Sequence, residues 1–317
     1  MMNKALRIGR ILLSLTVFMS LTVGLVVSSA FLDPVARWIG RIQFMPAVMT
    51  FSLGVFVVWL IITLVFGRVY CSAACPIGLI QDISARMFHR RKIYRFRQPF
   101  NPLRYAVLAV TLICLMLGLL ALPAFVDPYT LYLRFCSGCI APVADALGIQ
   151  TPSAPPYDPL DTPLTRAIAG SALGVAVTVM VMAVVVIVSA RSGRLICSTV
   201  CPVGTTLGFV SRFAIFQIDI DTDKCIQCRR CADVCKAECL DLNDHVVDGS
   251  RCVNCFNCIN VCPNDAIHYT TRRKQLSIPL MQSVKPISPK TEATLDTASP
   301  DCDHTSCKST TGNETIS

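Results

Sequence analysis

Charged side chains are scarce in this sequence, and they are missing altogether from several long runs. Asp, Glu, Lys and Arg make up only 15% of the 317 residues, against about a quarter in ordinary soluble proteins. Four runs contain no Asp, Glu, Lys, Arg or His and are long enough to cross a bilayer: Ile11–Leu32, Ala47–Phe66, Tyr105–Val126 and Ala167–Ala190. We therefore predict four transmembrane helices instead of a soluble globular fold.

Histidine is also rare, which limits the redox groups that the membrane part can hold. The chain has four histidines and none lies in a predicted span, so a membrane haem would lack its usual axial ligand. The outer pair Cys136 and Cys139 is followed by Ile140 rather than histidine, so it is not a c-type haem site. We expect no haem. A transporter is disfavoured as well, because no ionisable group lies within a span to bind substrate or relay protons.

Acidic residues are outnumbered, and the basic excess is unevenly distributed. The net charge is +9, with Lys and Arg concentrated before the first span and between the second and third: Lys4, Arg7, Arg10, Arg68, Arg86, Arg90, Arg91, Lys92, Arg95, Arg97 and Arg104. Positive loops stay in the cytoplasm, so both termini are expected there, facing anionic lipid instead of nucleic acid. Ser28–Ala30 resembles a cleavage site, and a signal peptide is the alternative for the first span.

Cysteine, by contrast, is abundant, and eight of the eighteen cysteines form two identical runs. The runs share the spacing Cys-x2-Cys-x2-Cys-x3-Cys: Cys225, Cys228, Cys231, Cys235 and then Cys252, Cys255, Cys258, Cys262. In two-cluster ferredoxins the fourth cysteine of each run ligates the other cluster. We therefore expect two [4Fe-4S] clusters with crossed ligands, Cys262 joining the first run and Cys235 the second. An offset of 27 residues also aligns Asp221 with Asp248 and Lys224 with Arg251, as in a duplicated half-domain.

Two alternatives to this assignment stay open. Zinc ribbons or a disulfide scaffold would also use many cysteines, but zinc sites use pairs, not runs of four. Lys236 stands where proline usually follows the fourth cysteine, and Cys239 follows three residues later, so either Cys235 or Cys239 could be the fourth ligand. We favour Cys235, which keeps the repeat in register, and interpret Cys239 as a small buried hydrophobe.

A second duplicated motif follows the second and fourth spans. Residues 67–78 and 193–204 are identical at seven of twelve positions, and both contain Cys-x3-Cys-Pro-x-Gly. Cysteines four residues apart share one helix face, so two related halves would bring together four thiols at the inner membrane boundary: Cys71, Cys75, Cys197 and Cys201. Four thiolates suit a third iron-sulfur centre or a tetrahedral metal ion. Buried thiols or transient disulfides are the alternative.

The remaining segments complete the predicted organisation. Residues 1–215 are expected to form the membrane domain, 216–275 the two-cluster ferredoxin domain, and 276–317 a disordered tail that includes Cys302 and Cys307. The outer loop 150–166 holds five prolines and should be extended. The Cys136–Cys139 pair is interpreted as structural or idle, or as a redox-active dithiol. The fold class is thus an α-helical membrane protein of two duplicated two-helix halves with a C-terminal α+β ferredoxin domain.

The order of these elements resembles a known family. Four spans, paired Cys-x3-Cys-Pro motifs at Cys71 and Cys197, and a double cluster run are similar to the membrane polyferredoxins, which include NapH-type quinol dehydrogenase subunits, MauN-type ferredoxin proteins and the carboxy-terminal half of NosR. The resemblance covers about residues 11–271. The chain departs from the pattern at Lys236, in its added tail and in lacking the flavin-binding domain of NosR, so no specific pathway carries over.

The resemblance implies an electron-transfer protein of the bacterial inner membrane. Such a protein relays single electrons between the quinone pool or a cytoplasmic donor and a partner redox enzyme, as a possible component of a quinol dehydrogenase. The alternative, of another class, is an accessory factor that reduces or handles metal while a respiratory enzyme matures. If quinol is oxidised here, Asp82 and His89 are the candidate proton acceptors, and a solvated interfacial face is the simpler interpretation of both.

Overall fold

The computed structural model describes residues 2–27, 32–44, 53–88, 94–119, 121–149, 151 and 171–271. Residues 1–284 form one compact unit and residues 285–317 a second. The expected tail 276–317, nearly all of the loop 150–166, and Ser28–Ala30 lie outside the described residues. The expected boundary at residue 215 falls inside the first unit, and everything below concerns that unit.

Two described helices are long and apolar enough to cross a membrane. They are α1 (Met2–Val26), through its residues 5–26, and α12 (Ala172–Ser192). Two further predicted spans coincide with apolar helices that are shorter over the described residues, α4 (Leu53–Phe66) and α7 (Asn101–Met116). The structure thus contains two candidate membrane helices among four apolar ones.

The third predicted span is interrupted. Helix α7 ends at Met116 because Gly118 adopts a left-handed backbone (φ +71°), and the Leu119 N–H donates to the Cys114 carbonyl at 2.8 Å. This is the common glycine-terminated helix end, in which N–H groups after the helix donate hydrogen bonds to its last free carbonyls. The chain resumes as α8 (Ala121–Val126), so residues 105–126 do not form one continuous helix.

Short helices connect the long ones. They are α2 (Leu32–Arg41), α5 (Val69–Ala73), α6 (Pro76–Phe88), α9 (Pro128–Phe135), the π-helix η1 (Cys136–Ile140), α10 (Ala141–Ala146), α13 (Leu195–Thr199) and α14 (Pro202–Ser211). Helix α6 follows the cysteines of the first Cys-x3-Cys-Pro motif, and helix α14 follows those of the second. Each begins at the proline of its motif, where the missing N–H costs no hydrogen bond.

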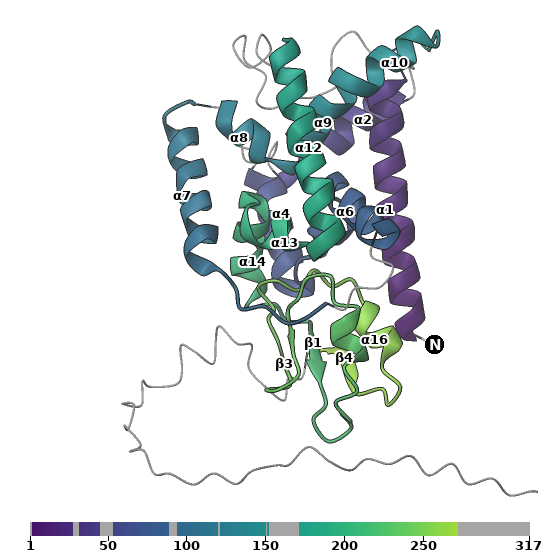
Figure 1. Cartoon of the computed structure of the whole chain (residues 1–317), viewed down its shortest axis with the longest axis vertical. Helices are drawn as coiled ribbons and strands as arrows, with labels where there is room; N and C mark the ends of the chain where they lie inside the picture. The colour runs from purple at the N-terminus through teal and green to yellow at the C-terminus, as the bar shows by residue number, and fades with distance from the viewer. Residues whose placement is uncertain are drawn as a thin grey trace, which may run out of the picture. The chain divides into compact units, whose positions relative to one another are not determined.

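The two halves of the helical part pack across each other. Helix α12 of the second half contacts α6 of the first, and α14 of the second half contacts α4 of the first. Figure 1 shows α12 beside α6 and α9. In each half the long helix ends at a glycine of positive φ, Gly67 (+75°) and Gly193 (+58°), before the motif helix starts. The sequence duplication is therefore a structural one, and each motif is held partly by the other half.

The two cysteine runs also form a structural repeat. Two-stranded antiparallel sheets pair β1 (Gln217–Ile220) with β4 (Ile267–Thr270) and β2 (Leu240–Asp241) with β3 (Val246–Val247). Shifted by 27 residues, β1 overlaps β3 at residues 246–247, and β2 overlaps β4 at residues 267–268. Each sheet therefore takes one strand from each repeat, so neither repeat completes a sheet alone.

The short helices and turns of the module follow the same offset. Helix α15 (Arg230–Asp233) corresponds to α16 (Asn257–Val261). Left-handed residues recur 27 positions apart in three pairs: Gln227 and Asn254, Arg229 and Phe256, Glu238 and Asp265. The acidic and basic residues that align at this offset form the same salt bridge in each repeat: Lys224 lies 3.9 Å from Asp221, and Arg251 lies 2.7 Å from Asp248.

Backbone hydrogen bonds join this module to the helical part. The N–H groups of Ile215 and Phe216 donate to the carbonyls of Leu64 and Val65, at 2.8 and 2.9 Å. The Arg194 N–H donates to the Lys236 carbonyl at 2.8 Å. The end of α4 and the start of the second motif are thus both fixed to the cysteine runs.

Candidate metal centres

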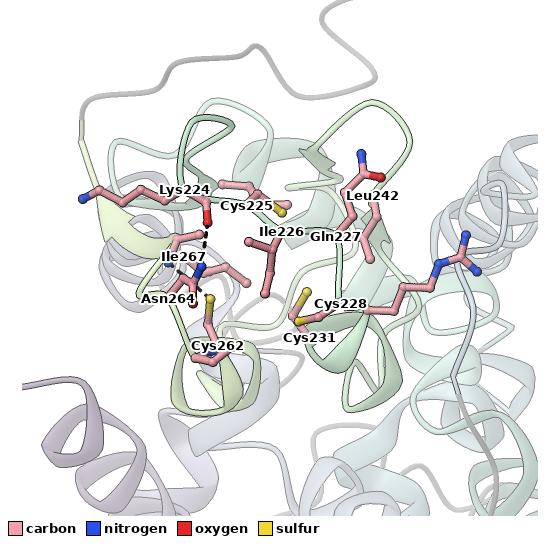
Figure 2. Close-up of a pocket in the computed structure, with 14 residues that line it drawn as sticks. Lys224, Cys225, Ile226, Gln227, Cys228, Cys231, Leu242, Cys262, Asn264 and Ile267 are labelled. Atoms are coloured by element: carbon pink, nitrogen blue, oxygen red, sulfur yellow. Dashed lines mark hydrogen bonds between the residues drawn. The ribbon is translucent and has the colours of Figure 1, made fainter. Parts of the chain in front are cut away.

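The first cysteine set lines one cavity at the strand end of the module. Cys225, Cys228 and Cys231 lie around it together with Cys262 from the second run, and Figure 2 shows their sulfurs around a common space. The Ala266 N–H donates to the Cys262 sulfur at 3.2 Å, a bond that stabilises a thiolate ligand. Cys228 is exposed, so this set lies close to solvent.

The second set lines a separate, more buried cavity. Cys252, Cys255 and Cys258 meet there with Cys235 from the first run and with Cys239. Cys239 is 2% exposed, and its sulfur lies 3.6 Å from that of Cys235. The hydrogen bond between Cys239 and Cys235 lowers the pKa of Cys235 below its ordinary value. The structure therefore brings together the crossed groups of cysteines and leaves both Cys235 and Cys239 beside the same cavity.

The cysteine sulfurs around these two cavities are the donor type that an iron-sulfur cluster uses. In the described ranges, no three His, Cys, Asp or Glu side chains lie close enough together to hold one metal ion. A cubane holds its four cysteine sulfurs further apart than a tetrahedral ion does, because each sulfur binds a different iron. Four or five sulfurs around each cavity therefore fit the donor set of a [4Fe-4S] cluster.

The four motif cysteines are buried in one neighbourhood. Cys71, Cys75, Cys197 and Cys201 are at most 8% exposed. Burial raises the pKa of Cys75 and Cys201 well above the ordinary value, and the other motif cysteines raise it further. Burial raises that of Cys197 to about 11, again assisted by Cys71. The cysteines of the two motifs thus lie in one buried, electrostatically linked region, and their role as one metal site stays a prediction.

Local hydrogen bonds orient two of these thiols. The Gly204 N–H donates to the Cys201 sulfur at 3.3 Å, and the Cys197 thiol donates to Gln81 Oε1 at 2.8 Å. Gly204 cannot carry a side chain, because a Cβ there would clash with the carbonyl oxygen of Cys197. Gly78 bears the same relation to Cys71. The final glycine of each motif thus permits the motif to fold tightly on itself.

The arginines of the two motifs reach across to the opposite half. Arg68 Nη2 donates to the Cys197 carbonyl at 3.0 Å, and Arg194 Nη1 donates to the Cys71 carbonyl at 2.8 Å. Arg68 Nη1 also donates to the Ser250 carbonyl at 2.9 Å. We call this exchange the arginine clasp. It holds the halves together and attaches the first motif to the second cysteine run.

Arg68 is a fully buried cation. Its exposed fraction is 0%, and none of the carboxylates among the described residues forms an ion pair with it. Its Nη2 instead lies 3.7 Å from the Cys71 sulfur. Burial lowers the pKa of Arg68, but Cys71 and Cys197 outweigh that effect and leave the pKa above its ordinary value. The positive charge is therefore directed at the motif cysteines.

Asp82 is the centre of a second charge cluster. Its carboxylate lies 2.9 Å from Arg194 Nη2, 3.2 Å from Lys236 Nζ and 3.3 Å from Arg10 Nη1. Burial alone would raise the pKa of Asp82, but the three cations, Arg194 foremost, hold it well below its ordinary value. Asp82 is therefore an ionised partner of buried cations, neither a solvated residue nor a proton acceptor. His89 lies outside the described residues.

Spacing alone did not reveal the roles of Arg68, Arg194 and Gln81. The signal for the two arginines was present, since both belong to the seven identical motif positions. The sequence held no signal for the role of Gln81, because its partner Cys197 is 116 residues away. Of the pair Cys136 and Cys139, Cys136 is buried and Cys139 half-buried, both within the π-helix η1. Cys302 and Cys307 lie outside the described residues.

Comparisons with known proteins agree with this geometry. Residues 48–95 and 174–218 match a family described as a 4Fe-4S binding domain, and residues 217–263 match a 4Fe-4S dicluster domain. The methylamine utilization ferredoxin-type protein MauN of Paracoccus denitrificans is 26% identical over 183 residues, 57% of this chain and 53% of MauN. An uncharacterized protein of Methanocaldococcus jannaschii is 46% identical over 39 residues, 12% of this chain and 16% of that protein.

These matches cover the parts of the chain that carry the cysteines. The chain spans about half the length of MauN and a sixth of the archaeal protein, and no solved structure matches it. The first match falls on both Cys-x3-Cys-Pro motifs and the second on both cysteine runs. The chain therefore carries 4Fe-4S binding domains and is similar to a MauN-type ferredoxin protein, a resemblance that the order of its motifs predicted.

Proposed function

We propose that the chain is a membrane-anchored iron-sulfur protein that relays single electrons between the quinone pool or a cytoplasmic donor and a partner redox enzyme. One observation carries the proposal: the two cysteine-lined cavities differ in exposure, and residues of the buried one pack against the core of the helical part. Cys228 of the first is exposed, whereas Cys255 of the second packs against the core that contains Cys71 and Cys201. Bound [4Fe-4S] clusters supply one-electron carriers, so the two sites form a path from solvent to the membrane motifs.

The ligand sets follow the crossed arrangement. Cys225, Cys228, Cys231 and Cys262 hold one cluster, and Cys252, Cys255, Cys258 and Cys235 hold the other. Cys235 is preferred to Cys239 because its position matches that of Cys262 in the repeat. Cys239 then donates a hydrogen bond to the Cys235 sulfur across their 3.6 Å separation.

The four motif cysteines form a third centre in this proposal. Support comes from Arg68, because a buried cation without a counter-charge is costly. Burial raises the pKa values of the neighbouring thiols, so free thiols would be neutral and would leave Arg68 uncompensated. Metal binding makes cysteines anionic, and Cys71, Cys75, Cys197 and Cys201 would then supply the charge that Arg68 lacks.

The proposed location is the bacterial inner membrane, with several spans and both termini in the cytoplasm. Support comes from the two long apolar helices and from the basic residues around the first span and after the second. Partners are then other redox subunits, which approach at the exposed first site or at the outer face.

Metal analysis of an anaerobic preparation tests the proposal. Two clusters require about eight irons and eight sulfides per chain, and a third about twelve. Cys228→Ala and Cys255→Ala should each remove one cluster by EPR, whereas Cys114→Ala on α7, outside every site, should remove none. Iron content near one per chain would refute the cluster assignment.

Turnover separates the relay from the maturation factor. A relay passes electrons from a reduced donor to its partner repeatedly, so cluster oxidation should follow partner turnover in a reconstituted membrane. A maturation factor changes the partner's metal content and then has no further effect. Full partner activity without the chain present would contradict the relay.

A further inference from the structure

A large apolar cavity lies beside the motif cysteines, between α6, α9, α12 and α13. Its volume is about 520 Å³, within the usual range for sites that bind organic ligands. None of the described residues that line it is charged, and most of them are valine, leucine, isoleucine or phenylalanine. A molecule that fills this space must therefore be largely apolar and without an ionic head group.

One side of the cavity is formed by the surface of α12. Met180 and Val184 line it and are 65% and 50% exposed, and α12 is one of the two helices that can cross a membrane. An opening between such residues faces lipid when α12 spans the bilayer. A membrane-soluble ligand can then enter sideways without passing through water.

The wall of the cavity also contains a polar group without a hydrogen-bond partner among the described residues. Gln81 is 0% exposed and lines the cavity. Its Oε1 accepts from the Cys197 thiol at 2.8 Å, while its Nε2 has no hydrogen-bond partner in the described part of the chain. Buried donors in proteins are nearly always paired. We therefore expect a ligand in the cavity to supply an acceptor oxygen for this N–H group.

We propose that this cavity binds a membrane quinone, with a ring carbonyl accepting a hydrogen bond from Gln81 Nε2 and the isoprenoid tail leaving past Met180 and Val184. A quinone combines the required features: a neutral head group, a carbonyl acceptor and an apolar tail. A phospholipid brings an ionic head group, for which this wall offers no charge. The inference rests on the proposed electron relay, because the ring lies beside Cys197 and Cys201, which line the same cavity.

Quinone binding to the full chain in quinone-free nanodiscs tests this assignment. Decylubiquinone and menaquinone-4 are titrated by calorimetry against wild type and three variants. Val184→Trp fills the entrance and should weaken binding of the better probe at least tenfold. Val179→Trp is the matched control, because Val179 is exposed on the same helix but does not line the cavity; it should bind as wild type. Gln81→Leu should lose about tenfold, the effect of one hydrogen bond.

Cluster EPR spectra, recorded on each variant, separate the two proposals. Intact spectra with weakened binding in Val184→Trp and Gln81→Leu support the quinone site. Wild-type affinity in both variants overturns it, as does a retained phospholipid that neither quinone displaces. Failure to bind either probe, with clusters that remain reducible by dithionite, overturns the quinone site but leaves the electron relay standing.

Discussion

Replacing Asp82 by Asn should destabilise the protein more than any comparable surface change. The carboxylate faces three cations, Arg10 on α1, Arg194 before α13, and Lys236 after the first cysteine run. Arg194 is 1% exposed and cannot turn to solvent when the carboxylate is neutralised. Removing one partner of a buried ion pair costs about 3–5 kcal/mol. The amide preserves shape and acceptor oxygen, so about 3 kcal/mol is expected.

Thermal unfolding in detergent measures this loss. At roughly 2–4 °C per kcal/mol for chains of similar size, the midpoint of Asp82→Asn should fall by roughly 6–12 °C. Asp221→Asn is the control: its partner Lys224 is 3.9 Å away with a side chain 58% exposed. Exposed pairs contribute at most about 1 kcal/mol, so the control should shift by no more than a few degrees.

A double variant tests the charge explanation separately from packing. Arg10→Met removes one cation from the cluster, so in the Asp82→Asn background it should be less harmful than in wild type. Contacting residues in one network typically couple by about 0.5–3 kcal/mol. Purely additive effects of Asp82→Asn and Arg10→Met would refute the reasoning.

The structure also predicts how the stability difference between wild type and Asp82→Asn depends on pH. The folded pKa of Asp82 lies well below its ordinary value, which is about 3.9. Its stabilisation is therefore fully present above about pH 4 and is lost only as pH falls through the folded pKa. Nearby Tyr94 stays neutral, since burial raises its pKa to about 12. The difference between wild type and Asp82→Asn should be constant from pH 5.5 to 8, and a marked decrease over that range would contradict an ionised Asp82.

Three further predictions concern the motifs and the topology. Gly204→Ala should destabilise the protein by about 1–3 kcal/mol, because the added methyl group overpacks against the Cys197 carbonyl. Gly54→Ala is the control and should be neutral, because the space around Gly54 is open. Urea unfolding measures both variants, and equal effects would contradict the prediction. Cys71→Ser alone should cost nearly as much electron-transfer activity as replacing all four motif cysteines, while the ferredoxin EPR signals persist; additive losses would indicate independent pairs. Reporter fusions at the carboxyl terminus and at Pro155 should report cytoplasm and periplasm respectively, and a periplasmic carboxyl terminus would overturn the topology.

Local repeats could be predicted from the sequence because each spans few residues. The spacing of the cysteine runs predicts which sulfurs share a neighbourhood, and the structure groups Cys262 with Cys225 as expected. Helices α6 and α14 were likewise predictable from the proline and the apolar periodicity that follow each motif. Hydropathy also indicated α1 and α12, since it reports composition over a window about as long as a span.

Contacts between distant residues could not be predicted in the same way. The break after α7 depends on one glycine, Gly118, whose left-handed backbone is not distinguishable in an apolar run from an ordinary membrane glycine. Asp82 was interpreted as interfacial because its neighbours in sequence are basic. Its burial results from partners 72 to 154 residues away, and no local pattern encodes those distances.

The arginine clasp also constrains the order in which the chain can be completed during synthesis. Arg68 bonds to Cys197 and Ser250, which lie 129 and 182 residues downstream. When the first motif leaves the ribosome, its guanidinium has neither acceptor, and it must wait until most of the chain has emerged. Such contacts of high sequence separation form late. The hydrogen bonds that join the two motifs to each other and to the second cysteine run therefore cannot all form until residue 250 has been translated.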